Sequence, residues 1–199
     1  MLVIAFLGMG KMGRPMAYNL ATAGFRVKCW NRTSEKLGSL PSILEAHEDL
    51  QRTIAGADVV ISMLSDGSAT KKVISKLENK VLSSIKTWIE MASVLPQEAI
   101  DQSAFFQKNN ITYLDAPVSG GTVAANNRNL AIMVGGEDDV YKEAIKIFEP
   151  LGKSVLVGPC GAGQLAKLAN QAIVGITIGA VAEAVLLLEK GGVNVDSVR

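Results

Sequence analysis

Residues Val3–Thr33 read VIAFLGMGKMGRPMAYNLATAGFRVKCWNRT, in which an apolar run enters the pattern Gly8-x-Gly10-x-x-Gly13 and a second apolar run leads to Asn31-Arg32-Thr33. This order predicts a βαβ unit that binds a dinucleotide, although a glycine-rich turn can also be merely structural. Gly8 would permit a tight turn, Gly10 would let the backbone approach a pyrophosphate, and Gly13 would let the helix pack on the sheet. The helix N-terminus would present free N–H groups to the phosphates. In this unit we expect coenzyme contacts from Gly8, Met9, Gly10, Lys11, Met12, Gly13, Asn31, Arg32 and Thr33.

The end of the second strand indicates which dinucleotide binds. Units that bind NAD usually carry Asp or Glu about 20 residues on, where it accepts a hydrogen bond from the ribose 2′-hydroxyl. Here the first carboxylate is Glu35, and Arg32 precedes it. The planar guanidinium can pair with a 2′-phosphate, and Asn31 and Thr33 can add neutral hydrogen bonds. We therefore expect NADP. The alternative is NAD, with Arg32 an ordinary solvated residue at a strand end.

Composition excludes several classes of protein. The 199 residues are 48% hydrophobic, which suits a sheet buried on both faces. Lys and Arg number 20 against 19 Asp and Glu, so the chain lacks the basic signature of a nucleic-acid-binding protein. Two distant cysteines, Cys29 and Cys160, and a single histidine, His47, predict neither a disulfide framework nor a metal site, and they disfavour a histidine-dependent hydrolase. No secretory signal is evident, and we expect a cytoplasmic protein.

Apolar strand patterns alternate with helical ones over three quarters of the chain, which predicts an α/β fold with a Rossmann-type doubly wound, mostly parallel sheet. The predicted strands are Leu2–Leu7, Arg26–Trp30, Val59–Leu64, Thr87–Met91, Thr112–Asp115, Leu130–Val134 and Ser154–Val157. The predicted helices are Lys11–Ala23, His47–Ile54, Thr70–Ser75, Pro96–Lys108 and Val140–Glu149.

A long apolar helix is then expected from Gln164 to Lys190, ended by Gly191-Gly192. Its segment Ala172–Leu188 falls just short of the usual transmembrane length and contains Glu183, so we expect a buried helix and no membrane association. We divide the chain into an NADP-binding domain, residues 1–160, and residues 161–199, which hold this helix and the start of an incomplete all-helical domain.

Three segments follow predicted strands, where doubly wound folds bind ligands. Met63, Leu64 and Ser65 are expected on the adenosine and phosphate side, and Ser93 near the nicotinamide; plain strand-to-loop turns are the alternative. In the segment 115–121, DAPVSGG, the Ser119 hydroxyl and the amides of Gly120 and Gly121 can hold a substrate carboxylate, as anion nests do. A connecting glycine loop is equally consistent with that segment.

Lys167 favours the functional interpretation. Lys167, Asn170 and Gln171 lie three and four residues apart on the long helix and therefore share one face. A lysine on an otherwise apolar helix is costly unless it lines a polar cavity, and a partly buried lysine can exchange protons near neutrality. A snorkelling lysine near the helix start is the alternative, but it does not explain the two amides.

Four ordered motifs, GMGKMGRPM, NRT, DAPVSGG and GAGQLAKLANQ, resemble the β-hydroxyacid dehydrogenases over the whole chain. That family includes 3-hydroxyisobutyrate dehydrogenases and the reductases of tartronate semialdehyde, glyoxylate and succinic semialdehyde, and it is related to 6-phosphogluconate dehydrogenase. The resemblance implies hydride transfer between NADP(H) and a small aldehyde acid, with Lys167 as the catalytic proton donor. It implies that Ser119, Gly120 and Gly121 bind the substrate carboxylate, that Asn170 and Gln171 orient substrate and lysine, and that Ser93 lies beside the nicotinamide.

Two departures leave alternatives open. Asn170-Gln171 looks like the tartronate-semialdehyde reductases, whereas Asn31-Arg32-Thr33 looks like the glyoxylate and succinic-semialdehyde reductases. Family members also continue through further helices that close the active site and build the dimer interface, so we expect a truncated form that associates through its last helix. The remaining alternatives are an NAD-dependent 3-hydroxyisobutyrate dehydrogenase and a coenzyme-binding module without turnover.

Overall fold

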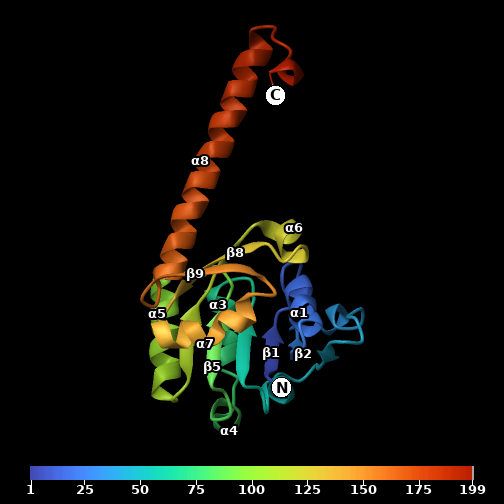
Figure 1. Ribbon diagram of the computed structural model, residues 1–199, viewed down its shortest axis with the longest axis vertical. Helices are drawn as coiled ribbons and strands as arrows, with labels where there is room; N and C mark the ends of the chain where they lie inside the picture. Colours follow the sequence, from blue (N-terminus) through green and yellow to red (C-terminus); the bar gives the residue numbers. More distant parts are fainter. Residues whose placement is uncertain (199) are drawn as a thin grey trace.

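A mostly parallel sheet forms the centre of the fold in the computed structural model, which describes residues 1–198 (Figure 1). Within those residues it has nine strands: β1 (Val3–Leu7), β2 (Arg26–Trp30), β3 (Glu45–Ala46), β4 (Val59–Ser62), β5 (Thr87–Glu90), β6 (Thr112–Asp115), β7 (Val118–Ser119), β8 (Leu130–Gly135) and β9 (Gly152–Gly158). The order is β3-β2-β1-β4-β5-β6-β8-β7, with β9 on β8. The strands from β3 to β6 in this order are parallel, and β8 is antiparallel to β6 and β7. The chain reverses its winding at β1, between β2 and β4, where such sheets bind ligands.

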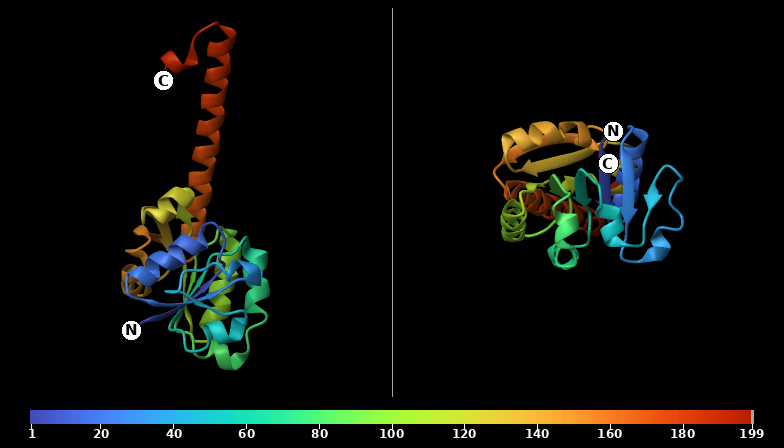
Figure 2. Two further views of the ribbon diagram at one scale, coloured as in Figure 1. Left: turned by 90° about the vertical axis from the view of Figure 1, so that its right-hand side faces the viewer. Right: turned by 90° about the horizontal axis from the view of Figure 1, so that it is seen from below.

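Helices cover both faces of the sheet, as the two views of Figure 2 show. They are α1 (Gly13–Thr22), α2 (Leu50–Ile54), α3 (Gly67–Ile74), α4 (Asn79–Leu82), α5 (Pro96–Lys108), α6 (Gly121–Asn126), α7 (Asp138–Phe148) and α8 (Ala162–Lys190), with short 3₁₀ turns η1 (Ser34–Lys36) and η2 (Val195–Ser197). Alternate residues of β1 point to opposite faces: Ile4 and Phe6 pack with α1 and α7, and Ala5 and Leu7 pack with α2, α3 and α5. Both faces are buried, which is why β1 is a continuous apolar run.

The predicted fold class is confirmed. The predictions that differ from the structure concern the first residues of two helices and four short elements. The helix expected from His47 begins at Leu50, because Asp49 caps it by accepting the Arg52 N–H (2.7 Å). The helix expected from Thr70 begins earlier, at Gly67, because the Asp66 carboxylate accepts the Ala69 N–H (2.8 Å). Four elements were not predicted: β3, β7, α4 and α6 each span six residues or fewer, too few to show a hydrophobic period.

The expectation of a buried last helix is wrong for the described residues. Gly163 and Gln164 in the first turn of α8 are buried, but the rest of the helix projects from the body (Figure 1). Its most apolar 18-residue window has a mean hydropathy of 2.0 and is 0% buried. By length and composition alone α8 could cross a membrane, a weak criterion that helices of soluble proteins also meet. The helix is exposed because, within residues 1–198, it leaves the sheet edge directly and only its start packs on the body.

Candidate functional site

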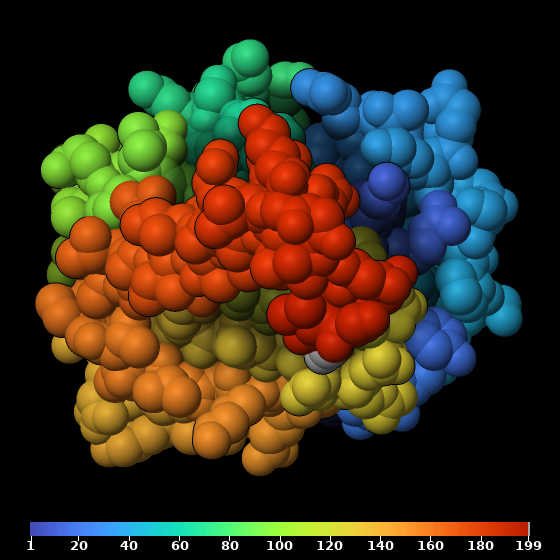
Figure 3. Space-filling view, turned by 90° about the horizontal axis from the view of Figure 1, so that it is seen from above, coloured from blue at the N-terminus to red at the C-terminus, as the bar shows by residue number. Residues whose placement is uncertain are grey.

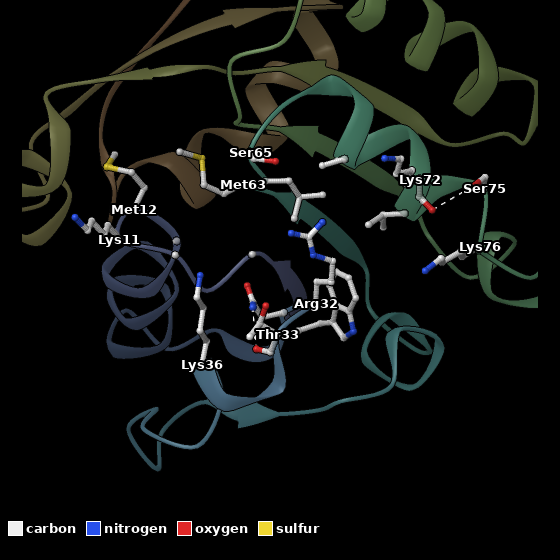
Figure 4. Close-up of a pocket in the computed structure, with 18 residues that line it drawn as sticks. Lys11, Met12, Arg32, Thr33, Lys36, Met63, Ser65, Lys72, Ser75 and Lys76 are labelled. Carbon is white, nitrogen blue, oxygen red and sulfur yellow. Dashed lines mark hydrogen bonds between the residues drawn. The ribbon is translucent and has the colours of Figure 1, made fainter.

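A cavity of about 500 Å³ lies at the carboxyl ends of β1, β2 and β4 (Figure 4). This is the crevice that the reversal of strand order creates. Its walls are Gly8, Gly10, Lys11, Met12, Gly13, Trp30, Asn31, Arg32, Thr33, Lys36, Met63, Leu64, Ser65, Ala69, Lys72, Val73, Ser75 and Lys76. All the residues expected at the coenzyme line it except Met9 and Ser93.

The three glycines of the first loop meet different structural requirements. Gly8 has a φ of +109°, and an added Cβ would collide with the Met63 carbonyl. A Cβ on Gly13 would collide with the Gly8 carbonyl, so α1 rests on the loop itself. Gly10 has an ordinary φ, and among the described residues no atom lies within 4 Å of its would-be Cβ. The fold therefore requires glycine at the first and third positions. At the second position the open space is on the cavity side, as expected for a cradle that a ligand approaches.

The loop is held by Asn31 at the end of β2. Asn31 Oδ1 accepts a hydrogen bond from the Met9 backbone N–H (3.0 Å), and its Nδ2 donates to the Thr33 carbonyl (2.9 Å). The Met9 side chain is 2% exposed and belongs to the core. The Met9 side chain therefore packs in the core, and the backbone of Met9 is the part that belongs to the loop surface. Asn31 joins the loop to β2.

Five cationic side chains surround the cavity, and within the described part of the chain no carboxylate lines it. Lys11 and Arg32 were expected from the sequence. Lys36 comes from η1, and Lys72 and Lys76 come from α3 and the turn after it. In Figure 4 Arg32 lies between Lys36 on the left and Lys72 and Lys76 on the right. The spacing of Lys36, one turn after Arg32, was a usable signal. The α3 lysines look in sequence like an ordinary solvated helix face, and only the strand order brings α3 to this cavity.

A second group of polar residues lies where α8 leaves the body. Lys167 Nζ donates a hydrogen bond to Gln171 Oε1 (2.9 Å). Asn170 Nδ2 donates to Ser119 Oγ (3.2 Å), which follows from α8 passing beside β7. Burial lowers the pKa of Lys167, since the charged amine loses water there. The structure thus brings Lys167, Asn170, Gln171 and Ser119 together.

The two glycines after Ser119 have backbone conformations that favour glycine. Gly120 has a φ of +124°, and its would-be Cβ collides with Ala124; Gly121, with a φ of +65°, begins α6. Both positive φ angles are ones that L side chains rarely adopt. Seen from above (Figure 3), α8 stands over the middle of this face, with α6 on one side and blue residues of the N-terminal βαβ unit beyond it. The site candidates therefore share one edge of the molecule.

Ser93 and Asp115 belong neither to the cavity lining nor to the group of polar residues around Lys167. Ser93 is exposed in the loop between β5 and α5, outside the cavity. Asp115, the first residue of DAPVSGG, is fully buried, and its carboxylate accepts the N–H groups of Gly161 (2.7 Å) and Gln164 (2.8 Å) at the start of α8. Burial raises the pKa of Asp115, and the hydrogen bonds oppose that change. The carboxylate of Asp115 therefore holds the start of α8 against β6.

Comparisons with known proteins agree with this geometry. Residues 3–160 match the family model of the NAD-binding domain of 6-phosphogluconate dehydrogenase, and residues 161–199 match that of NADP-dependent 3-hydroxyisobutyrate dehydrogenase. The chain is 36% identical to the 2-hydroxy-3-oxopropionate reductase of Escherichia coli, over 98% of this chain and 68% of that enzyme. It is 34% identical to a probable 3-hydroxyisobutyrate dehydrogenase of Mycobacterium bovis, over 99% of this chain and 67% of that one.

A solved structure extends the likeness to three dimensions. The 3-hydroxyisobutyrate dehydrogenase of Mycobacterium tuberculosis, determined with L-serine, matches with a TM-score of 0.91 and 32% identity. The match covers 100% of this chain and 68% of that one. The chain thus spans about two thirds of the length of these relatives.

Proposed function

This chain belongs to the β-hydroxyacid dehydrogenase family of oxidoreductases, and we propose that within it the chain transfers a hydride between NADP(H) and a small β-hydroxyacid or aldehyde acid. The substrate classes that we propose are glyoxylate, succinic semialdehyde and tartronate semialdehyde. One observation carries the proposal: the Lys167 amine, hydrogen-bonded to Gln171 beside Asn170 and Ser119, stands on the same edge of the molecule as the cation-lined cavity.

NADP is supported by the charge of the cavity. NADP carries a 2′-phosphate in addition to its pyrophosphate, and guanidinium and ammonium groups bind phosphates by charge-assisted hydrogen bonds. Arg32 and Lys36 approach from the β2 side, and Lys72 and Lys76 from the α3 side. The open space at Gly10 and the start of α1, where no described side chain caps the helix, fit the pyrophosphate. NAD remains the alternative coenzyme.

We assign the following roles to the residues near α8. When bound, the nicotinamide would supply or accept the hydride. Lys167 would give a proton to the carbonyl oxygen in reduction and take it back in oxidation, and burial, which lowers the pKa of its amine, favours release of that proton. The carboxylate of the substrate would be held by Ser119 with the amides of Gly120 and Gly121. Asn170 and Gln171 would orient the substrate and the lysine, and Ser93 would lie beside the nicotinamide.

Lys167→Ala tests the catalytic role. We expect the variant to lose turnover while its NADPH affinity stays within about threefold of the wild type, because proton transfer is removed and the coenzyme cavity is intact. Oxidation of NADPH and NADH is followed with glyoxylate, succinic semialdehyde and tartronate semialdehyde, and the reverse reaction with 3-hydroxyisobutyrate. Lys190→Ala, at the exposed far end of the same helix, is the control. Retained turnover in Lys167→Ala would exclude this role.

A second candidate function is coenzyme binding without turnover. It is supported by the exposure of the substrate-side residues, since the hydrogen bond between Lys167 and Gln171 is open to solvent. Under this alternative the protein binds NADPH but oxidises it with none of the four acids. Turnover with any of them would reject it.

We also propose that α8 associates with a second copy of the chain. Ile176 is 75% exposed and Leu187 74%, on a helix whose most apolar 18-residue window is 0% buried, and an exposed apolar surface of this kind marks an association site. Ile176→Glu should shift the sedimentation coefficient toward the monomer, because the charge would be buried in the contact. Wild-type protein that sediments as a monomer at high concentration would refute the association.

A further inference from the structure

The start of α8 is tied to the loop between β5 and α5 by one side chain. Gln164 is 1% exposed. Its Oε1 accepts a hydrogen bond from the Val94 backbone N–H (3.0 Å), and its Nε2 donates to the Ala92 carbonyl (2.9 Å). The amide thus pairs with the backbone on both sides of Ser93. Because leaving either group unpaired in the interior is costly, loop and helix are constrained to move together.

The same turn of α8 is fixed to the sheet from the side of β6. The Asp115 carboxylate accepts the N–H groups of Gly161 and Gln164, as described above. At Gly163 an added Cβ would collide with the Met133 carbonyl, so the backbone of the helix touches the backbone of β8. We call the contacts of residues 161–164 with the β5–α5 loop, β6 and β8 the joint. Because backbone contacts and hydrogen bonds form the joint, it holds the start of α8 more rigidly than flexible apolar side chains would.

The joint ends one helical turn before the candidate proton donor. Lys167 follows Gln164 by three residues on the same helix face, about 4.5 Å further along the axis. Ser93 is exposed between the two backbone groups that Gln164 holds. We propose that Gln164 is a positioning residue, which sets the place of Lys167 on α8 relative to Ser93 in the β5–α5 loop. The inference rests on the proposed function, since it assigns Gln164 a part in the same reaction.

Loss of stability alone would not establish this role, because any buried glutamine that loses its hydrogen bonds destabilises a protein. Gln102 supplies the matched control. It is 7% exposed, its Oε1 accepts a hydrogen bond from the Tyr113 hydroxyl (3.1 Å), and its side chain is bonded to β6 rather than to the loop that carries Ser93. Methionine keeps the length and flexibility of glutamine without its amide. Gln164→Met and Gln102→Met are therefore compared.

We expect Gln164→Met to lower kcat with glyoxylate and NADPH about 10- to 100-fold, since a displacement of about 1 Å between reacting groups costs rates of that order. The Kd of NADPH should stay within about threefold, because the cavity is not part of the joint. Gln102→Met should lose stability and keep kcat within about threefold. Gln164→Asn keeps the amide on a side chain one methylene shorter, so it provides a milder variant with a smaller fall in kcat if Gln164→Met does not fold.

A second measurement does not depend on turnover. The rate at which acetic anhydride acetylates Lys167, followed across pH by mass spectrometry, reports the apparent pKa of its amine. If the hydrogen bonds of Gln164 position Lys167, Gln164→Met or Gln164→Asn, neither of which adds a charge, raises that pKa toward an ordinary lysine value, and Gln102→Met leaves it unchanged. Wild-type protein that turns over none of the acids refutes the proposed function, and the acetylation profile still decides the inference. An unchanged profile in the Gln164 variants, or equal kcat losses at Gln164 and Gln102, would overturn it.

Discussion

Gly10→Ala separates what the glycine loop does for folding from what it does for a ligand. Gly10 has an ordinary φ, and no described atom lies within 4 Å of the position that a Cβ would take. Alanine therefore fits without strain and restricts the unfolded chain, so the free energy of unfolding should rise by about 0.4–1 kcal/mol. Gly8 and Gly13 have no such freedom, because a Cβ on either would meet backbone.

Gly10→Ala should weaken the binding of NADPH even though it stabilises the fold. The added methyl group would stand between the loop and a pyrophosphate, and loss of one charge-assisted amide hydrogen bond costs about 1.5–3 kcal/mol. That corresponds to an NADPH Kd weaker by about 10- to 150-fold, measured by titration calorimetry. Gly179→Ala in α8 is the matched control, since it too has open space; it should gain about 1 kcal/mol in urea denaturation and bind NADPH normally. A Gly10→Ala protein that is more stable and keeps its NADPH Kd within twofold would refute the placement of the pyrophosphate.

The remaining predictions concern charge. Arg32→Asp should raise the Kd of NADPH by at least about tenfold, because a hydrogen bond to a charged group is lost. The Kd of NADH should change by less than about threefold. Arg52→Asp, which alters the same charge on α2 outside the cavity, is the control; an unchanged preference between the coenzymes in Arg32→Asp would contradict the 2′-phosphate site. Glu90 is fully buried, and burial raises its pKa from 4.5 to about 7. Between these values the folded state keeps a proton that the unfolded state has lost, so wild-type stability should fall as pH rises across this window and stay low above it. Glu90→Gln should remove that slope and gain up to about 3 kcal/mol at pH 8 in urea denaturation, and an identical slope in the two proteins would argue against a protonated Glu90.

The coenzyme half of the site was largely predictable because its determinants are local. Gly8, Gly10 and Gly13 fall within one turn and one helix start, and Arg32 ends the next strand, so their spacing along the chain already indicates their arrangement in space. Which side chain of the loop enters the core was less evident, and the structure shows that it is the side chain of Met9. The short elements β3, β7, α4 and α6 escaped prediction because they span too few residues to show a hydrophobic period.

The contacts of the substrate-side residues on α8 were harder to predict from the sequence. The helical spacing of Lys167, Asn170 and Gln171 was visible in the sequence, but their contact with Ser119 depends on where α8 leaves the sheet. Asp115 stands within the motif that suggested carboxylate binding, yet it accepts backbone N–H groups of α8. The sequence places Gln164 on the same helix face as Lys167 but does not indicate its burial, because a glutamine on a helix is usually solvated.

The sequence by itself determined the strand-and-helix alternation, the glycine loop and the cation at the end of β2, because these follow from hydrophobic period and backbone freedom over a few residues. Tertiary structure alone decided that Lys72 and Lys76 line the same cavity as Arg32, and that Gln164 joins α8 to the loop carrying Ser93. Residues about 40 and 70 positions apart in the chain are brought to one site in these two cases, by strand order and by burial that no local pattern specifies.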